Sequence, residues 1–214
     1  MSSEDLKFAF VAFTAVFFVV DPLMAVPFFM AITADDSPEK RRRMAWRAAL
    51  AAFVTLVLFA VAGGLIFRAF GVSLGAFKIA GGLMLFLMAV DMMRAQPSRT
   101  RSTAEEQEEG VARDDVAIVP MAIPMLAGPG SIATVMVLMS RAAWQAVPTA
   151  AVLAGIAVTC LIAWLLLRSA AAAERFLSKT ALHVAQRVMG LLLAAIAVEF
   201  VVGGMRDLWP TFGG

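Results

Sequence analysis

Six long apolar runs constrain this chain more than any other feature of its sequence. A helix needs about 20 residues to cross a bilayer core that is about 30 Å thick, and each run is long enough. Only Asp21, Lys78, Arg187 and Glu199 place a charge inside them. The runs cover residues 8–34, 48–67, 69–90, 116–140, 142–167 and 180–205. We therefore expect an all-α, polytopic membrane protein with six transmembrane helices.

The composition agrees with a chain whose main partner is the lipid bilayer. Hydrophobic residues make up 61% of it and charged residues 16%, with a mean hydropathy of +0.85. Soluble domains hold about 45–50% apolar and about 25% charged residues. The net charge of +2 is too small to suggest a nucleic-acid partner. One histidine, one cysteine and no tyrosine leave little material for catalysis or metal binding. We therefore expect no enzyme, no metal and no cofactor.

The positive charges in the loops predict the orientation. Lys and Arg are enriched in cytoplasmic loops, and most of them follow the first, third and fifth runs. The three clusters are Lys40, Arg41, Arg42, Arg43 and Arg47; Arg94, Arg99, Arg101 and Arg113; and Arg168, Arg175 and Lys179. Both termini are therefore expected outside. The leader "MSSEDLK" is acidic, which argues against a cleaved signal peptide.

A polar linker is predicted at residues 94–115. It is rich in charge, Ser, Thr and Gln, and it holds too few apolar residues to fold alone. It divides the chain into a first three-helix repeat at residues 1–93 and a second at 116–214. An odd number of spans per half makes the second half run opposite to the first. This inverted repeat is a common plan of secondary transporters.

A short internal similarity supports the repeat. "GLMLFLMAVD" at 82–91 and "GLLLAAIAVE" at 190–199 are identical at five of ten positions, and both end on a carboxylate. The first span should then have its counterpart in the fourth. At an offset of 107 residues, Asp21 and Pro22 fall on Gly128 and Pro129. Both dipeptides lie near the middle of their runs, so helices 1 and 4 are expected to break near the bilayer midplane.

Each break is expected to start a second half-helix. Proline removes an N–H group and favours the first helical turn, which places Asp21 and Gly128 at N-cap positions. Non-helical backbone at membrane depth requires a protein or water-filled environment. The N–H groups after Gly128, including those of Gly130 and Ser131, would offer a partial positive charge to a substrate carboxylate.

The carboxylate of Asp21 is costly at the bilayer centre, by about 2.5–3.5 kcal/mol on insertion scales. It could cap the half-helix, bind a proton or Na+, or pair with a substrate ammonium. A purely structural cap is the alternative. Glu199, deep in the last run, is a second candidate ion or proton site. Lys78 and Arg187 lie near span starts and are expected to snorkel.

Three segments resemble the MarC-related family of bacterial inner-membrane proteins. They are "VVDPLMAVPFFMAIT", the following "SPEKRRRMA", and "VPMAIPMLAGPGSIATVMVLMS", and the resemblance extends over nearly the whole chain. In the family the first motif reads like DPxGxxP, and here Met24 stands at the glycine position. Asp21, Pro22 and Pro27 match the first motif, and Pro124, Gly128, Pro129, Gly130 and Ser131 match the second.

The resemblance implies a six-helix inverted-repeat protein of the bacterial inner membrane. Some relatives transport small neutral amino acids such as glycine and alanine with a cation gradient. This makes a transporter of that class, coupled to Na+ or H+, the leading hypothesis. An exporter or channel for another small solute, or a non-transporting membrane scaffold, are the alternatives. A homo-oligomer is left open.

Overall fold

The computed structural model describes residues 2–33, 36–94, 117–169 and 179–212, and their regular secondary structure is helical. The predicted linker lies outside the described residues except for Arg94. The expectation of an all-α chain is confirmed. The elements are α1 (Ser3–Val20), α2 (Pro22–Ile32), α3 (Pro38–Phe70), α4 (Leu74–Met93), η1 (Ala117–Leu126), α6 (Pro129–Ala142), α7 (Ala146–Arg168) and α9 (Lys179–Phe212).

Five segments are long and apolar enough to cross a membrane. They are Ser3–Met30, Pro38–Phe67, Leu74–Met93, Ala146–Arg168 and Gln186–Trp209. The fourth expected span, residues 116–140, consists of two shorter helices, η1 and α6. At 1.5 Å per residue the 14 residues of α6 cover only about 21 Å, so neither piece could cross a bilayer alone.

Large apolar side chains cover the outside of the helices. Leu58, Leu65, Leu83 and Leu191 are each more than half exposed, and they belong to α3, α4 and α9. A soluble protein would rarely expose apolar surface on this scale, whereas lipid tails are its natural solvent. The chain is therefore an integral membrane protein with several membrane-crossing helices.

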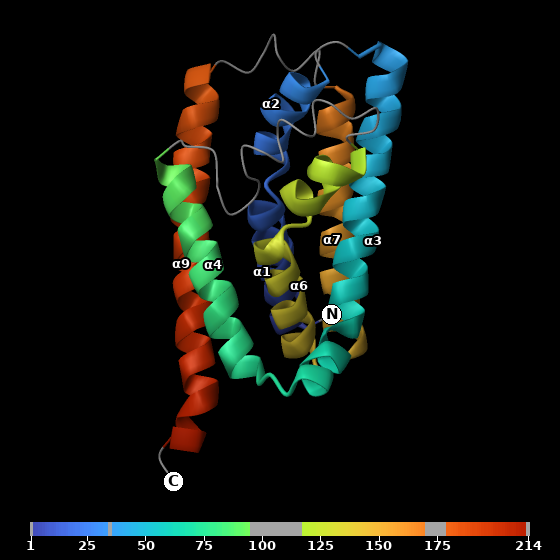
Figure 1. Cartoon of the computed structure of the whole chain (residues 1–214). Helices are drawn as coiled ribbons and strands as arrows, with labels where there is room; N and C mark the ends of the chain where they lie inside the picture. The colour runs from blue at the N-terminus through green and yellow to red at the C-terminus, as the bar shows by residue number, and fades with distance from the viewer. Residues whose placement is uncertain (1, 34–35, 95–116, 170–178, 213–214) are drawn as a thin grey trace.

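The helices form three groups, as Figure 1 shows. The pair α4 and α9 lies on one side. The interrupted helices, α1 with α2 and η1 with α6, occupy the middle. Helices α3 and α7 lie on the other side, where α7 packs on α1 and α3 packs on η1 and α6. Both ends of the chain lie toward the lower end of the bundle in this view.

Helices α4 and α9 meet backbone to backbone along a glycine seam. A Cβ atom placed on Gly82 would lie 2.8 Å from the carbonyl oxygen of Ala197, and one on Gly204 would lie 2.6 Å from that of Gly75. Small residues permit this close approach, which replaces the hydrophobic effect as the source of helix association in lipid. The sequence analysis did not single out Gly75 or Gly204.

An ion pair joins the same two helices. Lys78 is 7% exposed, and its ammonium contacts the carboxylate of Asp207 on α9. Asp207 is 40% exposed near the end of α9, so the Lys78 ammonium reaches an exposed carboxylate, a pairing that the sequence did not indicate. Arg187 of α9 is exposed, as snorkelling would require.

Candidate functional site

The first break is a single residue, Asp21, between α1 and α2. Its backbone lies in the left-handed region at φ 52° and ψ 63°, and its side chain is 0% exposed. Its N–H group donates to Phe17 O at 2.9 Å, which ends α1, and its carboxylate accepts from the Met24 N–H at 3.4 Å, which begins α2. A non-glycine residue in this conformation costs about 1–2 kcal/mol. Such strain, held in place by its surroundings, is a feature of functional sites.

The two prolines of the first motif, Pro22 and Pro27, have different effects on the helix. Pro22 occupies the first position of α2, where its missing N–H group has no helical partner to lose. Pro27 lies inside α2, and the helix continues through it to Ile32. The break therefore lies at Asp21 and Pro22, whereas Pro27, which matches the same motif, does not interrupt α2.

The second break separates η1 from α6. The last turn of η1 is widened, with Ala127 N–H donating to Ala122 O at 2.8 Å across five residues. Such π-type turns are frequent at functional sites. Pro124 lies within η1, and Gly128 is the N-cap of α6 with extended backbone at φ −77° and ψ 173°. Glycine has no side chain to cap the N–H groups that follow it.

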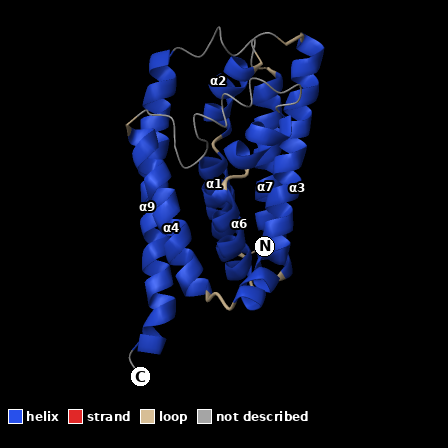
Figure 2. Ribbon diagram, in the orientation of Figure 1, coloured by secondary structure: helices blue, strands red, loops and turns tan. Residues whose placement is uncertain are grey.

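The two breaks meet inside the bundle. The hydroxyl of Ser131 lies 3.1 Å from Leu126 O, before the second break, and 3.4 Å from Val19 O, before the first. Ser131 is 2% exposed. Figure 2 shows the two breaks as short tan segments that lie close together in the middle of the bundle. Asp21, Pro22, Gly128, Pro129, Gly130 and Ser131 thus belong to neighbouring interruptions, although they are about 107 residues apart in the sequence.

Helix α4 closes one side of this region. A Cβ atom on Gly130 would lie 2.8 Å from Met88 Sδ and 3.0 Å from a methyl group of Leu85. The beginning of α6 therefore faces packed side chains of α4 in this conformation. Access of a solute from that side would require α4 to move.

Glu199 does not join the breaks. Its side chain is exposed on α9, whereas Asp21 is fully buried. The structure thus separates the two carboxylates that the sequence offered as ion or proton sites. Within the described residues, no group of three His, Cys, Asp or Glu side chains could hold a metal ion.

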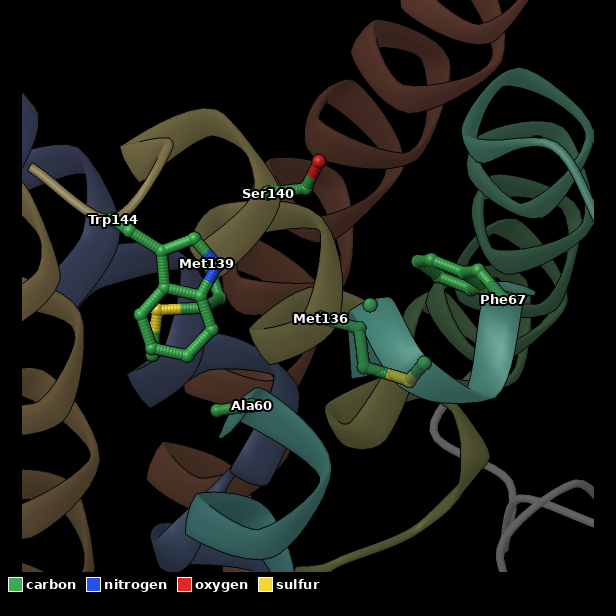
Figure 3. Close-up of a pocket in the computed structure, with 7 residues that line it drawn as sticks. Ala60, Phe67, Met136, Met139, Ser140 and Trp144 are labelled. Atoms are coloured by element: carbon green, nitrogen blue, oxygen red, sulfur yellow. The ribbon is translucent and has the colours of Figure 1, made fainter. Parts of the chain in front are cut away.

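Two cavities lie at opposite ends of the bundle. The first, of about 160 Å³, lies between α3 and the end of α6, and Figure 3 shows its wall. The second, of about 130 Å³, lies where α2 ends, α3 begins and α7 ends. We call them the α6-end cavity and the α2-end cavity. Neither cavity was predicted from the sequence.

Three pairs of residues that line the two cavities stand 107 positions apart in the sequence. At the offset of 107 residues, Phe29 corresponds to Met136, Thr33 to Ser140, and Ala60 to Leu167. The two members of each pair line different cavities: Phe29, Thr33 and Leu167 line the α2-end cavity, and Met136, Ser140 and Ala60 line the α6-end cavity. The same offset relates the two breaks, so it could have pointed to the cavities.

The long apolar helices and the apolar exterior agree with what a sequence comparison finds. A family profile described as MarC family integral membrane protein matches residues 6–209. The chain belongs to the MarC family. UPF0056 membrane proteins of Pyrococcus abyssi and Aquifex aeolicus are 35% and 34% identical to it, over 95% and 96% of this chain and 96% of each relative.

A further MarC relative, the UPF0056 membrane protein YvbG of Bacillus subtilis, is 34% identical over 96% of this chain and 98% of its own length. These names state a membrane protein and no substrate. No solved structure matches the chain.

Proposed function

We propose that this MarC-family protein is a cation-coupled secondary transporter of small neutral amino acids such as glycine or alanine. The observation that carries the proposal is the meeting of two buried helix breaks, joined by Ser131 and holding the carboxylate of Asp21. Paired interrupted helices at the centre of a membrane bundle are the usual substrate and ion sites of secondary transporters. The coupling ion is Na+ or H+, and either would suit one buried carboxylate.

Each group at the breaks has a role in this proposal. The N–H groups of Gly130 and Ser131 bind the substrate carboxylate, because a helix N-terminus carries partial positive charge. Asp21 binds the substrate ammonium or the coupling ion. Pro22 and Pro129 keep the helices interrupted by starting each second half. Glu199 is left out of the site, because it is exposed on α9.

The proposal includes an inverted repeat of two three-span halves. Reciprocal packing supports it: α1 and α2 of the first half pack on α7, while η1 and α6 of the second half pack on α3. Helix α4 packs on its own counterpart, α9. The α2-end and α6-end cavities are a third reciprocal pair at opposite ends. An access route from each end toward the breaks would begin at these cavities.

A channel is less consistent with the buried residues. A channel needs a continuous polar lining, and the described part of the chain buries few polar side chains. They are Asp21, Thr33, Lys78, Ser131, Thr134, Thr159 and Gln186. Lys78 pairs with Asp207 between α4 and α9, away from the breaks.

Uptake of labelled glycine and alanine into proteoliposomes tests the transport proposal. Na+ and H+ gradients are imposed separately on wild type, Asp21→Asn and Glu199→Gln. Asparagine keeps the N-cap and tolerates left-handed backbone, so Asp21→Asn removes the charge and spares the fold. We expect uptake that depends on one gradient, is abolished in Asp21→Asn and persists in Glu199→Gln. Absence of uptake in wild type under either gradient would remove the substrate claim.

Cysteine labelling tests the repeat and the orientation. In a Cys160→Ala background, Ser37→Cys and Ser140→Cys each place one exposed thiol beside one of the two cavities. We expect an impermeant maleimide added to intact cells to label Cys at position 140. The thiol at position 37 should react only after permeabilisation. Labelling of both thiols from the same side would refute the inverted arrangement.

A further inference from the structure

The α2-end cavity has a wall of two kinds. Apolar side chains form one part, from Phe29, Met30 and Leu167, and guanidinium groups form the other. The three arginines are Arg41, Arg42 and Arg168, and no acidic side chain is among the described residues that line the cavity. Its volume of about 130 Å³ is several times the roughly 30 Å³ that one water occupies in the liquid. It therefore has room for a small oxyanion beside an apolar wall.

Two of the arginines are held in place by their neighbours. Arg41 Nε donates to Thr33 O at 2.8 Å, which ties the start of α3 to the end of α2. The Arg168 guanidinium lies 5.3 Å from the centre of the Trp164 ring, within the range of a cation–π contact. An arginine fixed in this way loses less conformational entropy when it binds an anion.

The beginning of α3 adds to the positive potential. Ser37 caps this helix by accepting from the Lys40 N–H at 3.3 Å, and Pro38, at its first position, lines the cavity. A helix N-terminus favours an anion. The nearby carboxylate of Asp36 is 2.7 Å from the Lys40 ammonium, so its charge is largely offset there.

The α6-end cavity serves as an internal comparison, because the proposed repeat relates its position to that of the α2-end cavity. It occupies the equivalent position at the other end, and its described lining carries no charged side chain: Ala60, Gly64, Phe67, Met136, Met139, Ser140 and Trp144 (Figure 3). The shape is therefore common to both halves, but the arginines belong to one. Their presence needs an explanation beyond the internal repeat.

We propose that the α2-end cavity binds the phosphate of an anionic phospholipid headgroup. Arginine forks match phosphate oxygens in geometry and charge. A lipid fits better than a soluble phosphate because Phe29, Met30 and Leu167 make part of the wall apolar. In addition, Trp46, 51% exposed, stacks edge-on against Trp164 beside the cavity. Tryptophan is typical of the membrane–water interface, which is the depth of a headgroup. The proposal does not depend on transport.

Native mass spectrometry of the purified full chain in detergent tests it. Phosphatidylglycerol and phosphatidylcholine with the same acyl chains are titrated onto wild type and onto Arg42→Gln/Arg168→Gln, which leaves the Arg41–Thr33 bond intact. The control is Arg43→Gln/Arg94→Gln. It removes the same charge from two exposed arginines that do not line the cavity. A third variant, Arg42→Lys/Arg168→Lys, keeps the charge without the forks, and circular dichroism checks the fold of each.

We expect wild type to prefer phosphatidylglycerol over phosphatidylcholine. Each cavity arginine should contribute about fivefold, so the Gln pair should weaken phosphatidylglycerol binding about 25-fold. The control should lose far less, and the Lys pair should be intermediate. If the Gln pair fails to fold, the Lys pair decides the test: an affinity for phosphatidylglycerol equal to that of wild type would overturn the proposal. Equal losses in the Gln pair and the control, or equal binding of both lipids by wild type, would also refute it. Displacement of the lipid by millimolar inorganic phosphate would identify a soluble anion as the occupant and overturn the lipid assignment.

Discussion

Replacement of Gly204 by alanine should separate α4 from α9. The new Cβ would lie 2.6 Å from Gly75 O, 2.7 Å from Ile79 Cγ1 and 3.0 Å from Ile79 N. Two of these atoms belong to the backbone of α4, so no side-chain rotation can relieve the contact. The helices must move apart by several tenths of an ångström, and the seam then loses close contacts along its length.

The size of the effect follows from two opposing contributions. Overpacking of a close contact costs about 1–3 kcal/mol. Alanine in a helix interior regains about 0.5–1 kcal/mol over glycine. We therefore expect Gly204→Ala to lower the free energy of unfolding by about 1–2 kcal/mol.

Gly64→Ala is the matched control. Gly64 is also inside a helix, but no heavy atom lies within 4 Å of its added Cβ. This variant should gain the helical contribution alone and be unchanged or more stable by up to about 1 kcal/mol. Unfolding in mixed micelles by titration with sodium dodecyl sulfate, followed by circular dichroism, measures both. Equal stabilities of Gly204→Ala and Gly64→Ala would refute the account of the seam.

Substitutions at three further contacts are tested by the same titration. Ser131→Ala should lower the free energy of unfolding by about 1 kcal/mol, because the hydroxyl between the breaks is lost; Ser131→Thr, which keeps the hydroxyl, should lose less. Asp207→Asn should cost more than Lys78→Met, because only the former leaves a buried ammonium without its carboxylate; the reverse order would contradict the burial of the Lys78 ammonium. Gly71→Ala should cost about 1–2 kcal/mol, since Gly71 has φ +63°, and Gly71→Asn should cost less.

The sequence predicted the broken helices well because their causes are local. Asp21 before Pro22 and Gly128 before Pro129 are N-cap and first-turn signals, and the structure starts α2 and α6 at those prolines. The apolar runs likewise predicted the helical class. Pro27 is the sixth residue of α2 and removes one helical hydrogen bond, yet α2 continues to Ile32; the sequence alone does not show which motif proline ends a helix.

The sequence could not predict the features that depend on which helix faces face each other. The sequence did not indicate that Lys78 pairs with Asp207 of α9, more than a hundred residues away. Glu199 looked interior because it lies deep in an apolar run, but its face of α9 points outward. The α2-end cavity gathers Thr33, Arg41 and Arg168 from three helices, and periodicity along one helix carries no information about such a meeting.

The single-residue joint at Asp21 makes α2 a lever. Only the two backbone torsions of this residue separate the end of α1 from the start of α2, and the 11 residues of α2 extend about 16 Å from it. A rotation of about 10° at the joint would shift the far end of α2 by about 3 Å. That end carries Thr33, which is bonded to Arg41. A small rotation at Asp21 would thus be amplified into the shape of the arginine-lined cavity at the end of the bundle.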